Sequence, residues 1–346
     1  MPFKNDISAI RYIRHVIYTY VTKHLKNKQL RPPKLTDKQK ERLRILEPKL
    51  KIAISDREFE TAKSLVVDLQ TVLRKTGHLN RLLQSKNRLY ELALELNNLD
   101  FAIRGFEGNR KLVSDRTRLY LEATALLAVC YLRMEEIEKA KPLIKEVLQN
   151  DSVIKSERTR SKFRKEIVDR FNEETALYSL KNKEQEIFTE DELEKEVIKL
   201  ITRKTESEIY QSLGKNVPQH TKHLLFQVHE FSTKQLPSAE RLSLPSPEEK
   251  IKDKEVGKTV FQSVKRVLYN SLCDPKSEIY QVWFKNGMGM VLSKNYIRGA
   301  VIACLANIGI GIKMISASII ALIMKFGLEV YCEKYKPADL MELRGK

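Results

Sequence analysis

The stretch EFETAKSLV at residues 58–66 is echoed twice further along the chain, by NLDFAIRGF at 98–106 and by EIEKAKPLI at 136–144. One position is alanine in every copy, and the copies are 40 and 38 residues apart: Ala62, Ala102 and Ala140. A turn followed by an amphipathic helix, recurring at such a period, is typical of helix-pair repeats. The sequence therefore predicts an all-α fold, either a helical repeat or a bundle, in the first half of the chain.

The third copy resembles a tetratricopeptide repeat. The positions that carry the resemblance there are Leu127, Ala128, Tyr131, Ala140, Ile144 and Val147. The second copy keeps Leu89, Ala93, Ala102 and Phe106, and the first keeps Ala53, Ala62 and Val66. The resemblance covers about residues 45–150, with periods longer than the family's usual one. It implies a right-handed helical array whose concave face binds a peptide or another protein. A plain antiparallel bundle is the alternative.

Helix starts and a change of composition divide the chain into four regions. Thr36 with Gln39, Ser55 with Glu58, and Thr189 with Glu192 have the spacing of capping boxes. Phe163, Ile167 and Phe171 predict the buried stripe of a further helix within 155–171, with Arg158, Arg160, Lys162, Arg164 and Lys165 on its solvent side. Residues 232–256 hold three prolines and four serines without a sustained apolar period, and are predicted to be a linker. The predicted regions are a basic helix and connector at 1–34, a helical-repeat domain at 35–231, the linker, and a compact apolar helical domain at 257–346.

The N-terminal region concentrates positive charge. The whole chain has a net charge of +18, and residues 1–52 hold 14 Lys and Arg against 4 acids. Such an excess favours anionic partners. Nucleic acid is one candidate partner, and the predicted contact residues are Arg11, Arg14, Lys23, Lys26 and Lys28.

Residues 299–324 form a long apolar stretch, GAVIACLANIGIGIKMISASIIALIM, in which Lys313 is the only charged side chain. Its Leu, Ile and Val residues favour membrane insertion by about 3 to 6 kcal/mol, and a central lysine costs about 3 kcal/mol. An oligomer could place Lys313 and Asn307 in a lumen. The favoured alternative is two buried helices with Lys313 at a solvated turn between them.

The sequence offers no pattern typical of an enzyme, and we expect no cofactor and no metal. Gly257-Lys258-Thr259 lacks the earlier glycine and the strand of a phosphate-binding loop. His220, His223 and His229 lack a well-spaced fourth ligand and are expected at the surface. The four cysteines show no paired spacing, and we expect reduced thiols.

The sequence therefore predicts a non-enzymatic cytoplasmic interaction or scaffold protein that binds a protein partner through its helical-repeat surface. One alternative is a membrane-active effector at an inner or plasma membrane that inserts residues 299–324, for which the pairing of domains suggests bacterial stress or phage defence. The other is a nucleic-acid-binding protein that uses the basic N-terminal region. The sequence does not indicate an oligomeric state.

Overall fold

The structure, a computed structural model, describes residues 32–181, 186–243, 252–274, 277, 280–281, 294–307, 309–334 and 340. The regular elements in this described part of the chain are helices, without a strand among them. The prediction of an all-α fold is confirmed.

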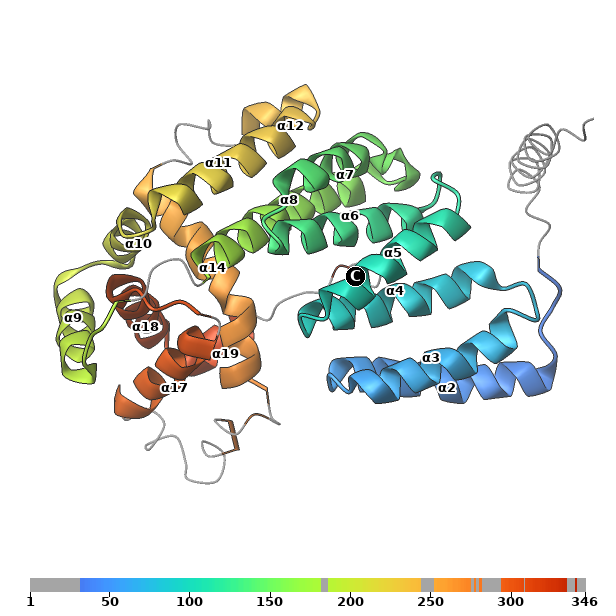
Figure 1. Ribbon diagram of the computed structural model, residues 1–346, viewed down its shortest axis with the longest axis horizontal. Coiled ribbons are helices and arrows are strands. Elements are labelled where there is room, and N and C mark those ends of the chain that lie inside the picture. The colour runs from blue at the N-terminus through green and yellow to red at the C-terminus, as the bar shows by residue number, and fades with distance from the viewer. Residues whose placement is uncertain are drawn as a thin grey trace, which may run out of the picture.

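The first six helices form three consecutive pairs, and each helix packs against the next (Figure 1). They are α2 (Asp37–Ser55), α3 (Phe59–Leu73), α4 (Leu79–Glu95), α5 (Leu99–Leu112), α6 (Arg118–Arg133) and α7 (Ile137–Gln149). This arrangement is compatible with a helical repeat.

The turn within each pair has the same backbone conformation. Its central residue has a positive φ, 59° at Arg57, 60° at Asn97 and 58° at Glu135. The next residue donates its N–H to the carbonyl five positions earlier, and the three bonds are Glu58 to Ala53, Asn98 to Ala93 and Glu136 to Tyr131. A residue in the left-handed region ends a helix while its last carbonyls stay hydrogen-bonded. The repeated sequence pattern therefore corresponds to one turn conformation that occurs in each of the three helix pairs.

The aligned alanines lie where the helices of each pair meet. Ala62, Ala102 and Ala140 are each 0% exposed. The capping boxes at Thr36 and Thr189 are present as predicted. The one predicted at Ser55 is wrong: Ser55 is the last residue of α2, and Glu58 is the N-cap of α3 without a side-chain cap.

The long helix α8 (Glu157–Leu180) follows the pairs and packs against α6. Its predicted stripe of Phe163, Ile167 and Phe171 is buried. Arg164, which was expected on the solvent side, has a side chain only 4% exposed and pairs with Asp151, Glu157 and Glu240. A buried arginine with several carboxylate partners keeps its charge without losing its hydrogen bonds.

Most of the remaining helices lie at the left of Figure 1, with α12 near its top centre. They are α9 (Glu190–Arg203), α10 (Glu206–Lys215), α11 (Gln219–Lys234), α12 (Ser238–Ser243), α14 (Asp253–Leu272), α17 (Lys294–Asn307), α18 (Lys313–Phe326) and α19 (Leu328–Lys334). Residues from both sides of the predicted linker enter one core, which contains Leu213 of α10, Phe261 of α14 and Ile319 of α18. Part of the predicted linker 232–256 is helical, and residues 244–251 lie outside the described residues. The apolar C-terminal helices therefore share a core with α8 to α11 instead of forming one of their own.

Two glycines explain how α10 and α14 pack so closely. A Cβ atom at Gly214 would lie 1.6 Å from the carbonyl oxygen of Asp253, and one at Gly257 would lie 1.9 Å from that of Tyr210. No side chain fits at either position, because the two helix backbones are in contact. Gly257 is the glycine of the Gly257-Lys258-Thr259 motif, which lies inside α14.

A disulfide joins the end of α14 to α19. Cys273 and Cys332 are bonded, with Cα atoms 5.5 Å apart across a sequence separation of 59 residues. The expectation of four reduced thiols is wrong for this pair, because the fold brings together cysteines that the sequence separates. Cys130 and Cys304 are free and buried.

Candidate functional site

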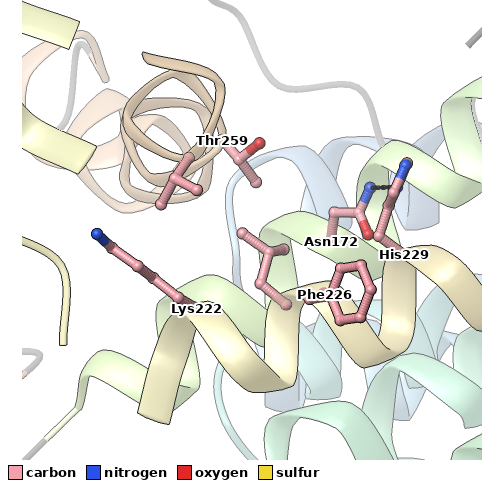
Figure 2. Close-up of a pocket in the computed structure, with 7 residues that line it drawn as sticks. Asn172, Lys222, Phe226, His229 and Thr259 are labelled. Atoms are coloured by element: carbon pink, nitrogen blue, oxygen red, sulfur yellow. Dashed lines mark hydrogen bonds between the residues drawn. The ribbon is translucent and has the colours of Figure 1, made fainter. Parts of the chain in front are cut away.

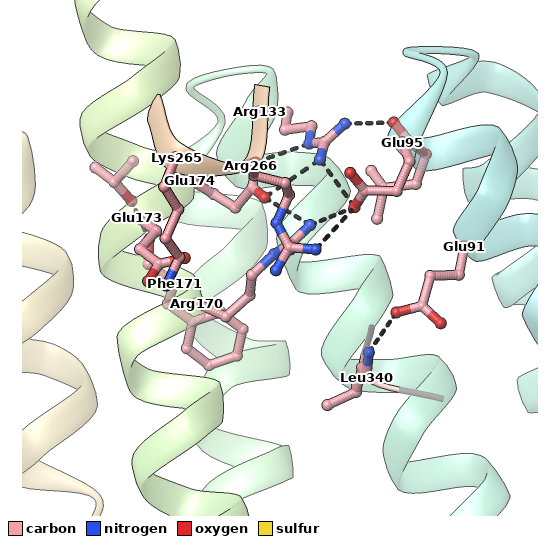
Figure 3. A network of polar contacts seen from close by, with 12 residues as sticks. Glu91, Glu95, Arg133, Arg170, Phe171, Glu173, Glu174, Lys265, Arg266 and Leu340 are labelled. Carbon is pink, nitrogen blue, oxygen red and sulfur yellow. Dashed lines mark hydrogen bonds and ion pairs between the residues drawn. The ribbon is translucent and has the colours of Figure 1, made fainter. Parts of the chain in front are cut away.

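A buried network of ion pairs joins the helix pairs to the C-terminal helices (Figure 3). Glu95 stands at the end of α4, Arg133 at the end of α6, Arg170 and Glu174 one turn apart on α8, and Arg266 on α14. The side chains of all five are at most 12% exposed.

Glu95 is the centre of this network. Its Oε1 atom lies 2.5 Å from Nη2 of Arg170, 3.3 Å from Nη2 of Arg133 and 3.9 Å from Nη1 of Arg266. Glu174 accepts two bonds from Arg133, from Nε at 2.7 Å and from Nη2 at 3.2 Å. It also lies 2.7 Å from Nη2 of Arg170. Planar guanidinium groups suit such bidentate pairing with carboxylates.

The electrostatics keep both carboxylates ionised. Burial acts to raise the pKa of Glu95, but Arg170, Arg133 and Arg266 outweigh it and hold that pKa far below its ordinary value. Burial likewise opposes ionisation of Glu174, and the charges of Arg133 and Arg170 again lower its pKa. A general acid or base needs a pKa near the working pH. Neither carboxylate is therefore suited to proton transfer near neutral pH.

Glu173, the neighbour of Glu174, behaves in the opposite way. Burial raises its pKa above the ordinary value, although Lys265 lies 3.5 Å away and lowers it. The pKa values of the two adjacent carboxylates are therefore displaced in opposite directions: burial has the larger effect at Glu173, and the charges of Arg133 and Arg170 outweigh it at Glu174.

A cavity of about 180 Å³ adjoins the network between α6, α8 and α14. Its apolar lining comprises Leu126, Val129, Ile167 and Leu340. Its charged lining is balanced in sign, with Glu166, Asp169, Arg170, Glu173, Lys265 and Arg266. A dry cavity of about 150 Å³ with apolar walls holds a benzene ring. This one therefore has room for a large side chain or a small ligand.

Leu340, near the C-terminus of the chain, is seated beside this cavity. Its backbone N–H donates to Oε1 of Glu91, on α4, at 2.6 Å, across 249 residues of sequence. Leu340 is 8% exposed and belongs to the same core cluster as Leu126 and Ile167. We call the surface that holds it the docking face, which consists of Glu91, Leu126, Val129, Ile167 and Arg170.

A second cavity is much smaller. It lies between α8, α11 and α14, with a volume of about 20 Å³, and Asn172, Lys222, Phe226, His229 and Thr259 are among its lining residues (Figure 2). Asn172 Nδ2 lies 3.1 Å from Nδ1 of His229. This volume accommodates about one water molecule, which excludes a larger ligand.

The structure places the predicted site residues in different ways. Arg11, Arg14, Lys23, Lys26 and Lys28 lie outside the described residues. Asn307 is the last residue of α17, and its side chain lies outside what is described. Residues 299–324 are split between α17 and α18, so Lys313 stands at the start of α18.

Lys313 has the surroundings of a solvated turn. Its backbone N–H donates to Glu186 at 2.8 Å, and its ammonium group lies 3.9 Å from a carboxylate oxygen of Glu192. Its side chain is 33% exposed. Gly309, with φ of 76°, provides the bend that precedes α18. None of the helices among the described residues has both the length and the apolar character needed to cross a bilayer.

The three histidines share α11 but face different surroundings. His220 lies 3.6 Å from Glu135, His223 lies 2.9 Å from Gln227, and His229 is 2% exposed against Asn172. The expected surface position is therefore wrong for His229. In the described ranges no group of three or more His, Cys, Asp and Glu residues could hold a metal ion.

The network and the docking face were not predicted from the sequence. A usable signal was present on α8, where Arg170 lies one turn from Ile167 of the buried stripe. Glu91 and Glu95 share a polar stripe of α4 with Asn87, so the hydrophobic period does not mark them as buried. A charge on an apolar helix face requires a buried partner. The partners come from distant helices, so the pattern does not identify them.

No family model matches the chain, and no curated protein or solved structure matches it either.

Proposed function

We propose that this chain is a non-enzymatic interaction protein whose tetratricopeptide-like helix pairs bind a segment of a partner protein on the docking face. The observation that carries the proposal is the seat of Leu340. A distant part of the same chain inserts an apolar side chain there and gives a backbone N–H to a buried carboxylate at 2.6 Å. A surface that holds one such segment has the chemistry to hold another.

The features around this seat favour binding over catalysis. The network next to it has carboxylates whose pKa values are held low, which suits a fixed framework. Fixed walls reduce the entropy lost when a segment binds. Glu91 supplies a buried carboxyl acceptor for a backbone donor, and loss of one partner of a buried hydrogen bond typically costs about 1 to 3 kcal/mol.

Selection from a displayed library of random peptides tests the proposal. The target is full-length protein carrying Leu340→Asp, which places a charge at the apolar seat and releases the chain's own segment. We expect peptides with micromolar affinity, weakened about tenfold or more by Glu91→Ala, as measured by fluorescence anisotropy.

Glu138→Ala is the matched control. Glu138 is also a glutamate of the helix pairs, but its side chain is 84% exposed and pairs with Lys141 on its own helix. This substitution should leave the affinity unchanged. Peptides that bind the Glu91 and Glu138 variants equally well would refute the docking face as the binding surface.

A further inference from the structure

The cavity beside Leu340 is larger than the side chain now seated there requires. It retains about 180 Å³ of space next to a leucine that is already 8% exposed. The hollow is partly open to solvent and therefore has room for a side chain bulkier than leucine that enters from outside.

The charges of the walls select against a charged occupant. An acidic side chain would face Glu166, Asp169 and Glu173, whereas a basic one would face Arg170, Lys265 and Arg266. Because the acidic and basic lining residues are equal in number, the walls give neither an acidic nor a basic side chain a net attraction. Either side chain would also lose its hydration on entering the cavity. A neutral side chain has no such cost.

The floor and the guanidinium groups favour an aromatic ring among neutral side chains. Leu126, Val129 and Ile167 form an apolar floor. Arg170 and Arg266 are among the lining residues, and an arginine side chain can stack on the face of an aromatic ring. An aromatic ring can therefore pack against both the apolar residues and the arginines of the lining, whereas an aliphatic side chain gains only from the apolar residues.

Resting on the proposed function, we propose that the partner of this chain is an extended segment that places an aromatic residue at the position of Leu340, so that its ring extends into the adjoining cavity. The partner's backbone N–H at that residue takes over the bond to Glu91. Leu340 of the chain itself is thus a weaker, resident occupant that the partner displaces.

Labelled synthetic peptides of residues 334–346 test this inference by fluorescence anisotropy. The peptides carry Leu340, Leu340→Phe or Leu340→Asp, and each is titrated into full-length protein with its own Leu340→Asp. We expect the Leu340→Phe peptide to bind about tenfold more tightly than the leucine peptide, a difference of about 1.4 kcal/mol. The Leu340→Asp peptide should not bind.

A second protein variant fills the cavity from its floor. Val129→Phe, or Val129→Met if the larger side chain prevents folding, should abolish the preference for the aromatic peptide. Circular dichroism confirms that each variant is folded. If the leucine peptide binds but the aromatic one gains nothing, the inference fails and the proposed function stands. If none of the peptides binds the folded protein, the docking face is not a peptide-binding surface and both fail.

Discussion

Substitution of Glu95 by glutamine tests whether the buried network holds the helix pairs to the C-terminal helices. One oxygen of Glu95 lies within 3.9 Å of three guanidinium groups, those of Arg133, Arg170 and Arg266. The substitution keeps the shape of the side chain and removes its charge. Only Glu174 then remains to balance Arg133 and Arg170. Loss of one partner from a buried ion pair typically costs 3–5 kcal/mol, and we expect a loss of about that size.

The assay is urea denaturation of full-length protein followed by circular dichroism, with the free energy of unfolding obtained by linear extrapolation. Its pH dependence has a defined sign. The pKa of Glu95 is lower in the folded state than its value of about 4.3 in an unfolded chain. Its stabilising contribution is therefore fully present above about pH 4.3 and is lost as the pH falls toward the folded-state pKa. The difference between wild type and Glu95→Gln should be constant near neutral pH and shrink in acid.

Glu173→Gln is the matched control, with an opposite expectation. Burial raises the pKa of Glu173 in the folded state, so its charged form is disfavoured there even with Lys265 nearby. The glutamine variant should be as stable as wild type or slightly more stable at neutral pH, and this gain should vanish below about pH 4.3. Equal losses for the Glu95 and Glu173 variants, or a loss below about 1 kcal/mol for Glu95→Gln, would refute the charge arrangement.

Two further pairs of substitutions test the backbone, each by the same unfolding measurement. Gly257→Ala should lower the free energy of unfolding by at least about 3 kcal/mol, because its Cβ would lie 1.9 Å from a carbonyl oxygen of α10. Gly108→Ala should instead raise it by about 0.5 to 1 kcal/mol, because nothing lies within 4 Å of a Cβ atom there. A tolerated Gly257→Ala would contradict the close packing of α10 on α14. Glu135→Gly should raise the free energy of unfolding by about 1 kcal/mol. Glu135 has φ of 58°, a conformation that glycine adopts without the steric cost of a Cβ atom. Asn97→Gly should raise the free energy of unfolding by less, since asparagine tolerates this conformation. Equal increases for the two variants would contradict the assignment of the cost to positive φ.

Features fixed by local chemistry could be predicted from the sequence. The repeated turn is one, since its hydrogen bonds join residues at most five positions apart. The capping boxes at Thr36 and Thr189 are others, because cap and partner are three residues apart. The capping box predicted at Ser55 is wrong because the same residue spacing occurs there at the end of a helix. Arg57, with its positive φ, starts the turn that follows.

Features that depend on distant partners could not be predicted. The hydrophobic period of α8 correctly predicts Phe163 and Phe171 as buried, but it cannot reveal that Arg164 is buried too. The partners of Arg164 include Glu240, 76 residues away. Burial of a charge depends on compensation by another charge, and this is a property of the assembled fold.

The apolar stretch illustrates the same limit at a larger scale. Its composition is compatible with a membrane span or with two packed helices, and the two alternatives differ in the surroundings of Lys313. The turn at Gly309 and the contacts of Lys313 with Glu186 and Glu192 correspond to the second. Those glutamates come from a segment more than a hundred residues earlier, so the sequence alone leaves both alternatives open.

The network and the docking face depend on each other through α8 and α14. Arg170 contributes to both, pairing with Glu95 on one side and lining the cavity on the other. Arg266 does the same from α14. The ion pairs hold in place two arginines that line the cavity, and a wall fixed in advance loses little entropy on binding. A substitution that loosens the network should therefore weaken peptide binding without touching the peptide. Glu95→Gln is expected to affect affinity as well as stability.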